Sequence, residues 1–140
     1  MNQENILSVR DLVVEYTSGK DVIHAVNGVS FDMKRGETLA LVGETGAGKT
    51  TIARSILRIL PNPPARVKGG EIIFEGEDLM KKPEGDMLHI RGEKIAMIFQ
   101  DPMTALNPVT SVGKQVEEGI LLHNNYTAAE AREKAYEMFN

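Results

Sequence analysis

Residues 43–50 read Gly-Glu-Thr-Gly-Ala-Gly-Lys-Thr, which is a glycine, four residues and then Gly-Lys-Thr. The run before this stretch, 38–42, is short and apolar, as in a buried parallel strand, and residues 51–60 carry a helical pattern. Strand, loop and helix therefore follow one another in the order of a phosphate-binding loop. This order predicts an α/β fold.

The residue types in the loop suit the binding of a polyphosphate. Glycines allow backbone conformations closed to other residues, so that successive N–H groups surround a phosphate, and the dipole of the following helix adds to the attraction. Lys49 would contact the β- and γ-phosphates, and the Thr50 hydroxyl would ligate the Mg²⁺ that bridges them. The candidate nucleotide-binding residues of this stretch are Gly43, Glu44, Thr45, Gly46, Ala47, Gly48, Lys49, Thr50 and Thr51.

Two other interpretations of the glycine-rich loop are weaker. A plain turn before a helix needs neither the lysine nor the hydroxyl that follows it. A dinucleotide-binding pattern that starts at Gly46 needs a glycine at position 51, where this sequence has Thr51.

Length and composition exclude several classes of protein. The 140 residues, 41% of them hydrophobic, predict one domain, which we expect to be incomplete because it is small for a nucleotide-hydrolysing protein. A net charge of −4 offers no basic surface, so no nucleic-acid partner is expected. The absence of cysteine excludes thiolate chemistry, and three scattered histidines form no ligand cluster. No leader or long apolar run is present, which favours a cytoplasmic protein.

The residues before the loop have the pattern of an antiparallel β layer. Residues 6–16 and 22–33 are strand-like, and residues 17–21 form a turn between them. This order argues against small nucleotide kinases, which open with the phosphate-binding loop. Tyr16 stands near the end of the first strand, and taken alone its ring either packs half-buried or stacks on an adenine base.

Further strands and turns are expected after the loop helix. Residues 67–74 predict a strand, and Asp78 is placed to cap a short helix in the region 80–90. Residues 95–99 form a second apolar run of the length of a buried parallel strand, and this run ends at Gln100.

The last part of the sequence predicts a loop and two helices. Residues 101–108 form a loop bounded by prolines, and its Met103 and Leu106 either dock a partner or anchor the loop. A helix is expected from Ser111, and Thr127-Ala128-Ala129-Glu130 is a capping box that starts another.

Four stretches together resemble the ATP-binding subunit of an ABC transporter, specifically the oligopeptide/dipeptide (peptide/nickel) importer group. They are residues 24–31, the Walker A loop 43–50, residues 70–79, and residues 95–108. The last stretch is the most specific, because Asp-Pro-Met-Thr-Ala-Leu-Asn-Pro after Gln100 looks like the extension found in peptide and nickel importers.

This resemblance implies a P-loop NTPase (RecA-like) core with an N-terminal antiparallel β layer and the start of a helical subdomain. Residues 1–140 would be a single, truncated ABC nucleotide-binding domain. Residues 1–100 would hold the β layer and the core through the Q-loop, and residues 101–140 would begin the helical subdomain.

The resemblance also assigns roles outside the loop. Tyr16 matches the A-loop aromatic that stacks on adenine, and Val26 would form a wall of the base pocket. Gln100 matches the Q-loop glutamine and would ligate Mg²⁺ beside Thr50; the alternative is a glutamine that only caps a strand. ATP and Mg²⁺ are therefore the expected cofactors.

Departures from the family pattern limit what this chain is expected to do. Thr45, Ala47 and Thr50 replace serines usual in the group, and Thr50 keeps the hydroxyl. The sequence has no Leu-Ser-Gly-Gly-Gln signature, no Walker B strand and no switch histidine, so no catalytic residue is assigned. We expect the intact parent to be an ATP hydrolase and these 140 residues alone to lack turnover.

The function that the resemblance implies is ATP-driven import of peptides or a related small solute. The expected partners are transmembrane permease subunits, a second ATPase subunit and, indirectly, an extracellular solute-binding protein. The expected location is the inner face of the cell membrane. Two alternatives stay open: a nucleotide-binding fragment without turnover, and a soluble ABC ATPase outside transport.

Nucleotide affinity should depend on Lys49. The Lys49→Ala variant should bind ATP more weakly, because the ammonium supplies the point charge that meets the phosphates. Titration of fluorescent ATP against the wild type and the variant measures the difference. Equal affinities would rule out the assignment of the phosphate-binding loop.

Overall fold

The computed structural model of the protein describes residues 5–101 and 106–139. In chain order its elements are β1 (Asn5–Ser18), β2 (Asp21–Lys34), α1 (Lys49–Ile56), β3 (Ala65–Phe74), β4 (Glu77–Asp78), α2 (Glu84–Ile90), α3 (Val112–His123) and α4 (Ala128–Met138). They fall into two compact units, Met1–Met87 and Leu88–Asn140. None of the helices described is long and apolar enough to cross a membrane.

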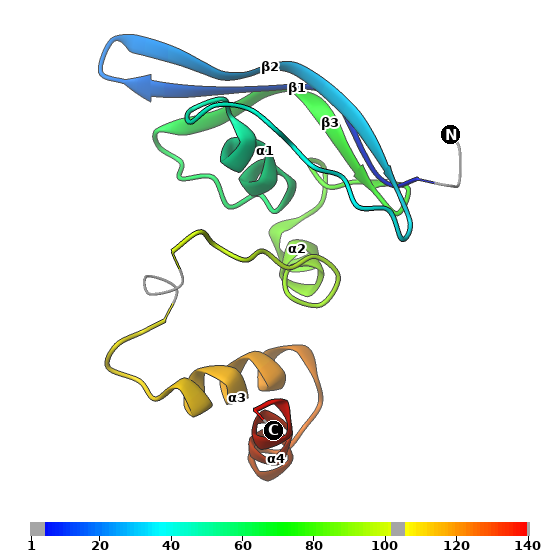
Figure 1. Cartoon of the computed structure of the whole chain (residues 1–140), viewed down its shortest axis with the longest axis vertical. Coiled ribbons are helices and arrows are strands. Elements are labelled where there is room, and N and C mark those ends of the chain that lie inside the picture. The colour runs from blue at the N-terminus through cyan, green and yellow to red at the C-terminus, as the bar shows by residue number, and fades with distance from the viewer. Residues whose placement is uncertain (1–4, 102–105, 140) are drawn as a thin grey trace. The chain divides into compact units, whose positions relative to one another are not determined.

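The first unit is built on an antiparallel sheet of four strands in the order β2-β1-β3-β4. β1 is central, because it pairs with β2 along one edge and with β3 along the other. The predicted antiparallel layer ahead of the loop is thereby confirmed, and β3, predicted as a strand at 67–74, extends it. α1 lies against one face of this sheet (Figure 1).

A bulge near the middle of β1 keeps its apolar residues on one face. Val9 and Leu12, three positions apart, pair with residues only two positions apart on β2, and Asp11 between them has a φ of 45°. The extra residue shifts the alternation of the strand by one position. As a result four apolar side chains of β1 are buried on both sides of the bulge, namely Leu7, Val9, Leu12 and Val14.

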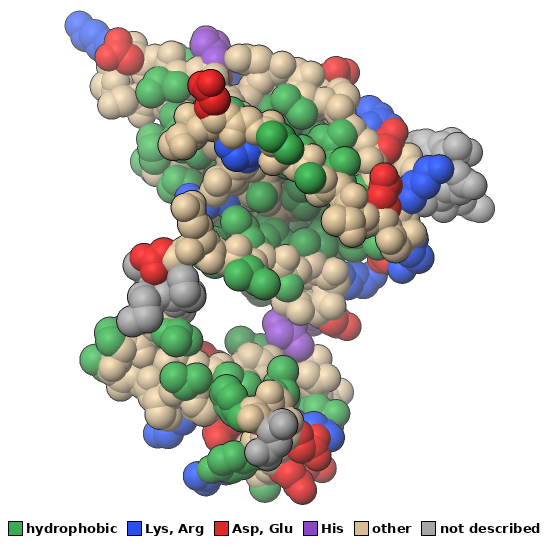
Figure 2. Space-filling view, in the orientation of Figure 1, with side chains coloured by type: hydrophobic (Ala, Val, Ile, Leu, Met, Phe, Trp, Pro, Cys, Tyr) green, Lys and Arg blue, Asp and Glu red, His purple; other side chains and the backbone are tan. Residues whose placement is uncertain are grey.

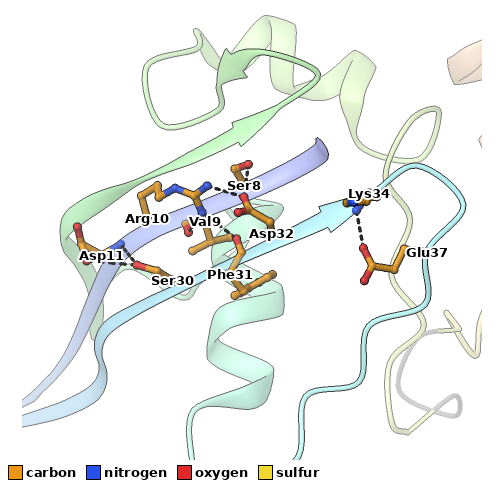
Figure 3. A network of polar contacts seen from close by, with 9 residues as sticks. All are labelled: Ser8, Val9, Arg10, Asp11, Ser30, Phe31, Asp32, Lys34 and Glu37. Atoms are coloured by element: carbon orange, nitrogen blue, oxygen red, sulfur yellow. Dashed lines mark hydrogen bonds and ion pairs between the residues drawn. The ribbon is translucent and has the colours of Figure 1, made fainter. Parts of the chain in front are cut away.

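Polar side chains join β1 to β2 around the bulge (Figure 3). The backbone N–H of Asp11 donates to the Ser30 hydroxyl at 2.8 Å. The Ser8 hydroxyl, at 2.6 Å, and the Arg10 guanidinium both donate to the carboxylate of Asp32. These two donors hold the pKa of Asp32 below its usual value. The group is exposed, so the ion pair of Arg10 and Asp32 adds little to the stability of the fold.

α1 is shorter than the sequence predicts. The helix was expected over 51–60 but spans Lys49–Ile56, because Arg58 takes a φ of 53° that ends the helical path. The guanidinium of Arg58 donates to the carbonyl oxygens of Leu79 at 3.0 Å and Lys82 at 2.6 Å. The side chain that follows α1 thus holds the segment after β4.

Asp78 does not cap a helix as predicted. Its carboxylate accepts a hydrogen bond from the backbone N–H of Met80 at 3.0 Å, which closes a turn, and α2 begins later, at Glu84. Pro83 immediately precedes this start and cannot donate a backbone hydrogen bond, so the helix begins after it.

The two buried parallel strands expected at 38–42 and 95–99 are not formed. Within the described residues neither segment joins a sheet, and the second makes only an isolated bridge between Ile95 and Arg91. A parallel strand needs neighbours on both edges, and no described strand of its own unit pairs with either segment. Apolar side chains are therefore exposed, including Val42 at 94% and Ile98 at 95%. Figure 2 shows hydrophobic side chains in scattered groups on the visible surface.

The second unit contains α3 and α4, which pack against each other. The capping box that starts α4 is confirmed: the Thr127 hydroxyl accepts from the backbone N–H of Glu130, whose carboxylate accepts from the backbone N–H of Thr127 at 2.8 Å. These Thr127 donors lower the pKa of Glu130. Ala131 and Ala135 are buried, so small side chains of α4 allow close packing.

Gly70 should be essential to the bulge of β1. It has a φ of 96°, and an added Cβ would lie 2.6 Å from the Arg10 carbonyl oxygen and from the Leu12 Cα. The Gly70→Ala variant should therefore lose about 2–3 kcal/mol of unfolding free energy, measured by urea denaturation. Gly76→Ala is the matched control, because its φ of 85° is similar and nothing lies within 4 Å of its Cβ. Equal losses in the two variants would contradict the steric account.

Candidate functional site

The loop at 43–50 turns tightly into α1. Gly46 and Gly48 have φ angles of 86° and 81°, in the left-handed region that favours glycine. The backbone N–H of Ala47 donates to the Glu44 carbonyl at 3.1 Å, which closes the turn. Residues 43–47 are exposed, so the loop presents its backbone to solvent.

Gly48 fixes the loop against β2. A Cβ on Gly48 would collide with the carbonyl oxygen of Ala25 and would lie 3.4 Å from the Val26 side chain. Ala25 falls at a register shift between β1 and β2, where Val14 pairs with Val26 and Glu15 pairs with His24. This irregularity leaves Ala25 outside the ladder, with its carbonyl against the loop. Only glycine permits such a close approach.

The N-terminus of α1 is suited to an anion. Gly48 is its N-cap residue, no side chain among the described residues caps it, and its first turn contains no acidic residue. The first intrahelical donor is the N–H of Ile52, which bonds to the Gly48 carbonyl at 2.9 Å. The N–H groups before it have no intrahelical acceptor, and the helix dipole adds partial positive charge there.

The ammonium of Lys49 lies over the loop that precedes it. Nζ donates to the carbonyl oxygens of Gly43 and Glu44, each at 2.7 Å. These contacts use two of the three ammonium donors and hold the charge beside the exposed backbone. The Thr50 residue next to it is exposed. The loop thus combines backbone donors, a cation and a hydroxyl within a few residues.

Tyr16 and Thr51 are brought together from distant parts of the sequence. The Tyr16 hydroxyl lies 3.3 Å from the Thr51 hydroxyl, and both residues are half-buried. Tyr16 comes from the end of β1 and Thr51 from the first turn of α1. Val26, expected as a wall of a base pocket, is 3% exposed and lies under Gly48. The roles of Tyr16 and Val26 toward a base stay predictions.

Gln100 and the loop after it belong to the second unit. Gln100 is exposed, and its role as a ligand of Mg²⁺ stays a prediction. Met103 lies outside the described residues, so the choice between docking and anchoring is not tested there. Leu106 and Val109 of the same stretch are 46% and 88% exposed.

The residues of the loop fit ATP and Mg²⁺. The glycine conformations, the α1 terminus without a side-chain cap and the Lys49 ammonium match what a triphosphate requires. Thr50 has the hydroxyl group that serves as a magnesium ligand in such loops. Among the described residues, no group of three or more histidine or acidic side chains could hold a metal, so any metal here would depend on the phosphates for ligands.

The fold is that of an ATP-binding cassette. The solved dimeric structure of a post-hydrolysis state of the cassette MJ0796, bound to ADP and Pi, has a TM-score of 0.79 at 22% identity, covering 94% of this chain and 54% of that chain. The structure of cbiO1 from Clostridium perfringens, part of the ABC transporter complex cbiONQ, has a TM-score of 0.65 at 27% identity over 93% and 47%. The predicted fold class is confirmed.

Residues 26–140 match the model of the ABC transporter family, and the chain belongs to this family. It is 49% identical over 133 residues to a probable peptide ABC transporter ATP-binding protein, y4tR, of Sinorhizobium fredii. It is 43% identical over 133 residues to the oligopeptide transport ATP-binding protein OppD of Bacillus subtilis, and 44% identical over 137 residues to the dipeptide transport ATP-binding protein DppD of that organism. The resemblance to the peptide importer group is confirmed.

The chain spans about two-fifths of the length of these curated relatives. The alignments cover 95%, 95% and 98% of this chain but 40%, 37% and 41% of y4tR, OppD and DppD.

Two contacts of the site could not be read from the sequence. Neither the approach of Gly48 to Ala25 nor the pairing of the Tyr16 and Thr51 hydroxyls has a local signal, because both join elements far apart in the chain. The one sequence signal for the first contact was Gly48 itself, because a glycine often marks a place where another backbone segment approaches closely.

The close approach at Gly48 should matter more than its backbone conformation. Gly48→Ala should displace the loop from β2, weaken ATP binding by more than about tenfold and cost roughly 2–3 kcal/mol of stability. Gly46→Ala is the matched control, because its φ of 86° is similar and nothing lies within 4 Å of its Cβ. That control should cost about 1–2 kcal/mol. Urea denaturation and ATP titration of both variants measure these effects. Equal effects in the two variants would contradict the importance of the close approach between Gly48 and the Ala25 carbonyl.

Proposed function

We propose that the protein is the ATP-binding part of an ABC importer ATPase, which couples ATP binding and hydrolysis to the import of peptides or a related small solute. The observation that carries this proposal is the phosphate-binding loop, in which Gly48 lies against the Ala25 carbonyl and Lys49 lies over the Gly43 and Glu44 carbonyls. Membership of the ABC transporter family supports it.

In this proposal the loop residues bind the triphosphate. The backbone N–H groups of the loop and of the first turn of α1 bind phosphate oxygens, and Lys49 supplies positive charge to the β- and γ-phosphates. Thr50 and Gln100 supply oxygen ligands to Mg²⁺, and Tyr16 stacks on the base beside Val26. The magnesium ion would neutralise charge that develops on the phosphates.

Peptides are proposed as the cargo because of the names that the relatives carry. The proteins OppD, DppD and y4tR are described as oligopeptide, dipeptide and peptide transport ATP-binding proteins. The sequence extension after Gln100 supports the same group. Substrate choice would rest with membrane and extracellular subunits, so a related solute is equally compatible with the residues of this chain.

The proposed partners are transmembrane permease subunits and a second ATPase subunit, with the protein on the inner face of the cell membrane. The solved cassette MJ0796 is a dimer, and cbiO1 is part of a transporter complex. Exposed apolar residues near the start of α3 support a membrane partner, among them Leu106, Val109 and Val112.

A single cysteine tests the proposed partner. The sequence contains no cysteine, so Val109→Cys gives the chain one reactive thiol, at a side chain that is 88% exposed. Cross-linking in cells of the native host should capture a permease subunit, identified by mass spectrometry of the membrane fraction. The Val22→Cys variant, 49% exposed in β2, is the control and should not capture it. Capture of soluble proteins alone by Val109→Cys would favour an ABC ATPase outside transport.

A further inference from the structure

We infer that Thr51 is a positioning residue that holds the ring of Tyr16 for the base of a bound nucleotide, through the contact of their hydroxyl groups. The inference rests on the proposed function, because it takes Tyr16 as the residue that stacks on the base. It adds a role for the Thr51 side chain and a link between the base site and the phosphate site.

The contact joins two elements that build different parts of the site. The hydroxyl oxygens of Tyr16 and Thr51 are 3.3 Å apart, although the residues are 35 positions apart in sequence. Tyr16 stands near the end of β1, and Thr51 lies two residues after Lys49 in the first turn of α1. The turn that carries the phosphate-binding residues therefore also holds the aromatic ring.

The two ends of the Tyr16 residue are held by different means. Its backbone lies in the sheet between Ile23 of β2 and Ala65 of β3. The Thr51 hydroxyl contacts the far end of the side chain, so that both side-chain torsions are restricted before any ligand arrives. A ring ordered in advance loses less conformational entropy when a base stacks on it.

The position of Thr51 also allows occupancy of one site to affect the other. A phosphate bound at the start of α1 orders the first turn of the helix, and that turn contains the Thr51 hydroxyl. The orientation of the Tyr16 ring then depends on the same turn. Binding of the phosphates and of the base should therefore be cooperative, to the extent that the contact between Tyr16 and Thr51 orders the ring.

The experiment compares a ligand that has a base with one that lacks it. Affinities of Mg-ATP and of Mg-tripolyphosphate are measured by calorimetry for the wild type, Thr51→Val, Tyr16→Phe and the double variant. Each single change should weaken ATP binding about twofold to fivefold. This effect is small for the loss of a hydrogen bond, because 3.3 Å is a long distance between two hydroxyl oxygens. The double variant should lose no more than Thr51→Val alone, and both single variants should lower the ratio of ATP affinity to tripolyphosphate affinity equally. Tyr16→Phe should leave tripolyphosphate binding unchanged.

Two control variants separate positioning from general damage. Thr51→Ser keeps the hydroxyl and should keep the wild-type affinity for ATP. Thr17→Val removes a hydroxyl from an exposed residue adjacent to Tyr16 and should have no effect. Circular dichroism and urea denaturation confirm that each variant is folded. If Thr51→Val fails to fold, Tyr16→Phe and Thr51→Ser still decide the result.

Three outcomes would overturn the inference. Weaker tripolyphosphate binding by Thr51→Val, with an unchanged ratio of ATP affinity to tripolyphosphate affinity, would mean that the hydroxyl acts on phosphate alone. Additive losses in the double variant, or ATP affinity unchanged in Tyr16→Phe, would mean that the contact does not position the ring. The proposed function fails differently: in that case the wild type binds neither ligand, or Tyr16→Ala leaves the preference for ATP over tripolyphosphate unchanged.

Discussion

The approach of Gly48 to the Ala25 carbonyl is the constraint on which the rest of the site depends. It fixes the start of α1 against β2, and through α1 it sets the places of Lys49 and Thr51. The contact needs a residue without a side chain on the loop and an irregularity in β2 that turns a carbonyl toward it. The antiparallel layer ahead of the loop therefore supports the candidate site as well as covering the core.

Local signals in the sequence predicted the elements that have local causes. The loop glycines, the capping box of Thr127 and Glu130, and the hairpin of β1 and β2 depend on residues close together in the chain. The segments 38–42 and 95–99 have the composition of buried strands, yet a strand forms only where another strand can pair with it. The composition of these segments could not predict whether they form strands, because strand formation depends on a neighbouring strand elsewhere in the structure. The helix end at Arg58 depends equally on carbonyl groups some twenty residues away.

The exposed apolar segments have a bearing on how the protein behaves in isolation. Val42 and Ile98 are almost fully exposed, and neither lies in a strand of the sheet. Surfaces of this kind favour association, either with further parts of a larger assembly or with other copies. The residues of the loop and the part of β2 that supports Gly48, in contrast, all lie within the first unit.

The bulge at Asp11 has a consequence for how related sequences should be aligned. Asp11 is an extra residue relative to both neighbouring strands, and the residues before and after it face the core in the same phase. A relative that lacks one residue between Val9 and Leu12 would still bring its counterpart of Tyr16 to the face that carries α1. Gly28 of β2 and Lys68 of β3, which are extra residues just beyond the bulge, would then lose their match in β1. A gap of one residue placed between Leu12 and Tyr16 would turn that side chain to the opposite face. A one-residue deletion therefore preserves the face on which Tyr16 lies when it falls at the bulge, and changes that face when it falls beyond the bulge.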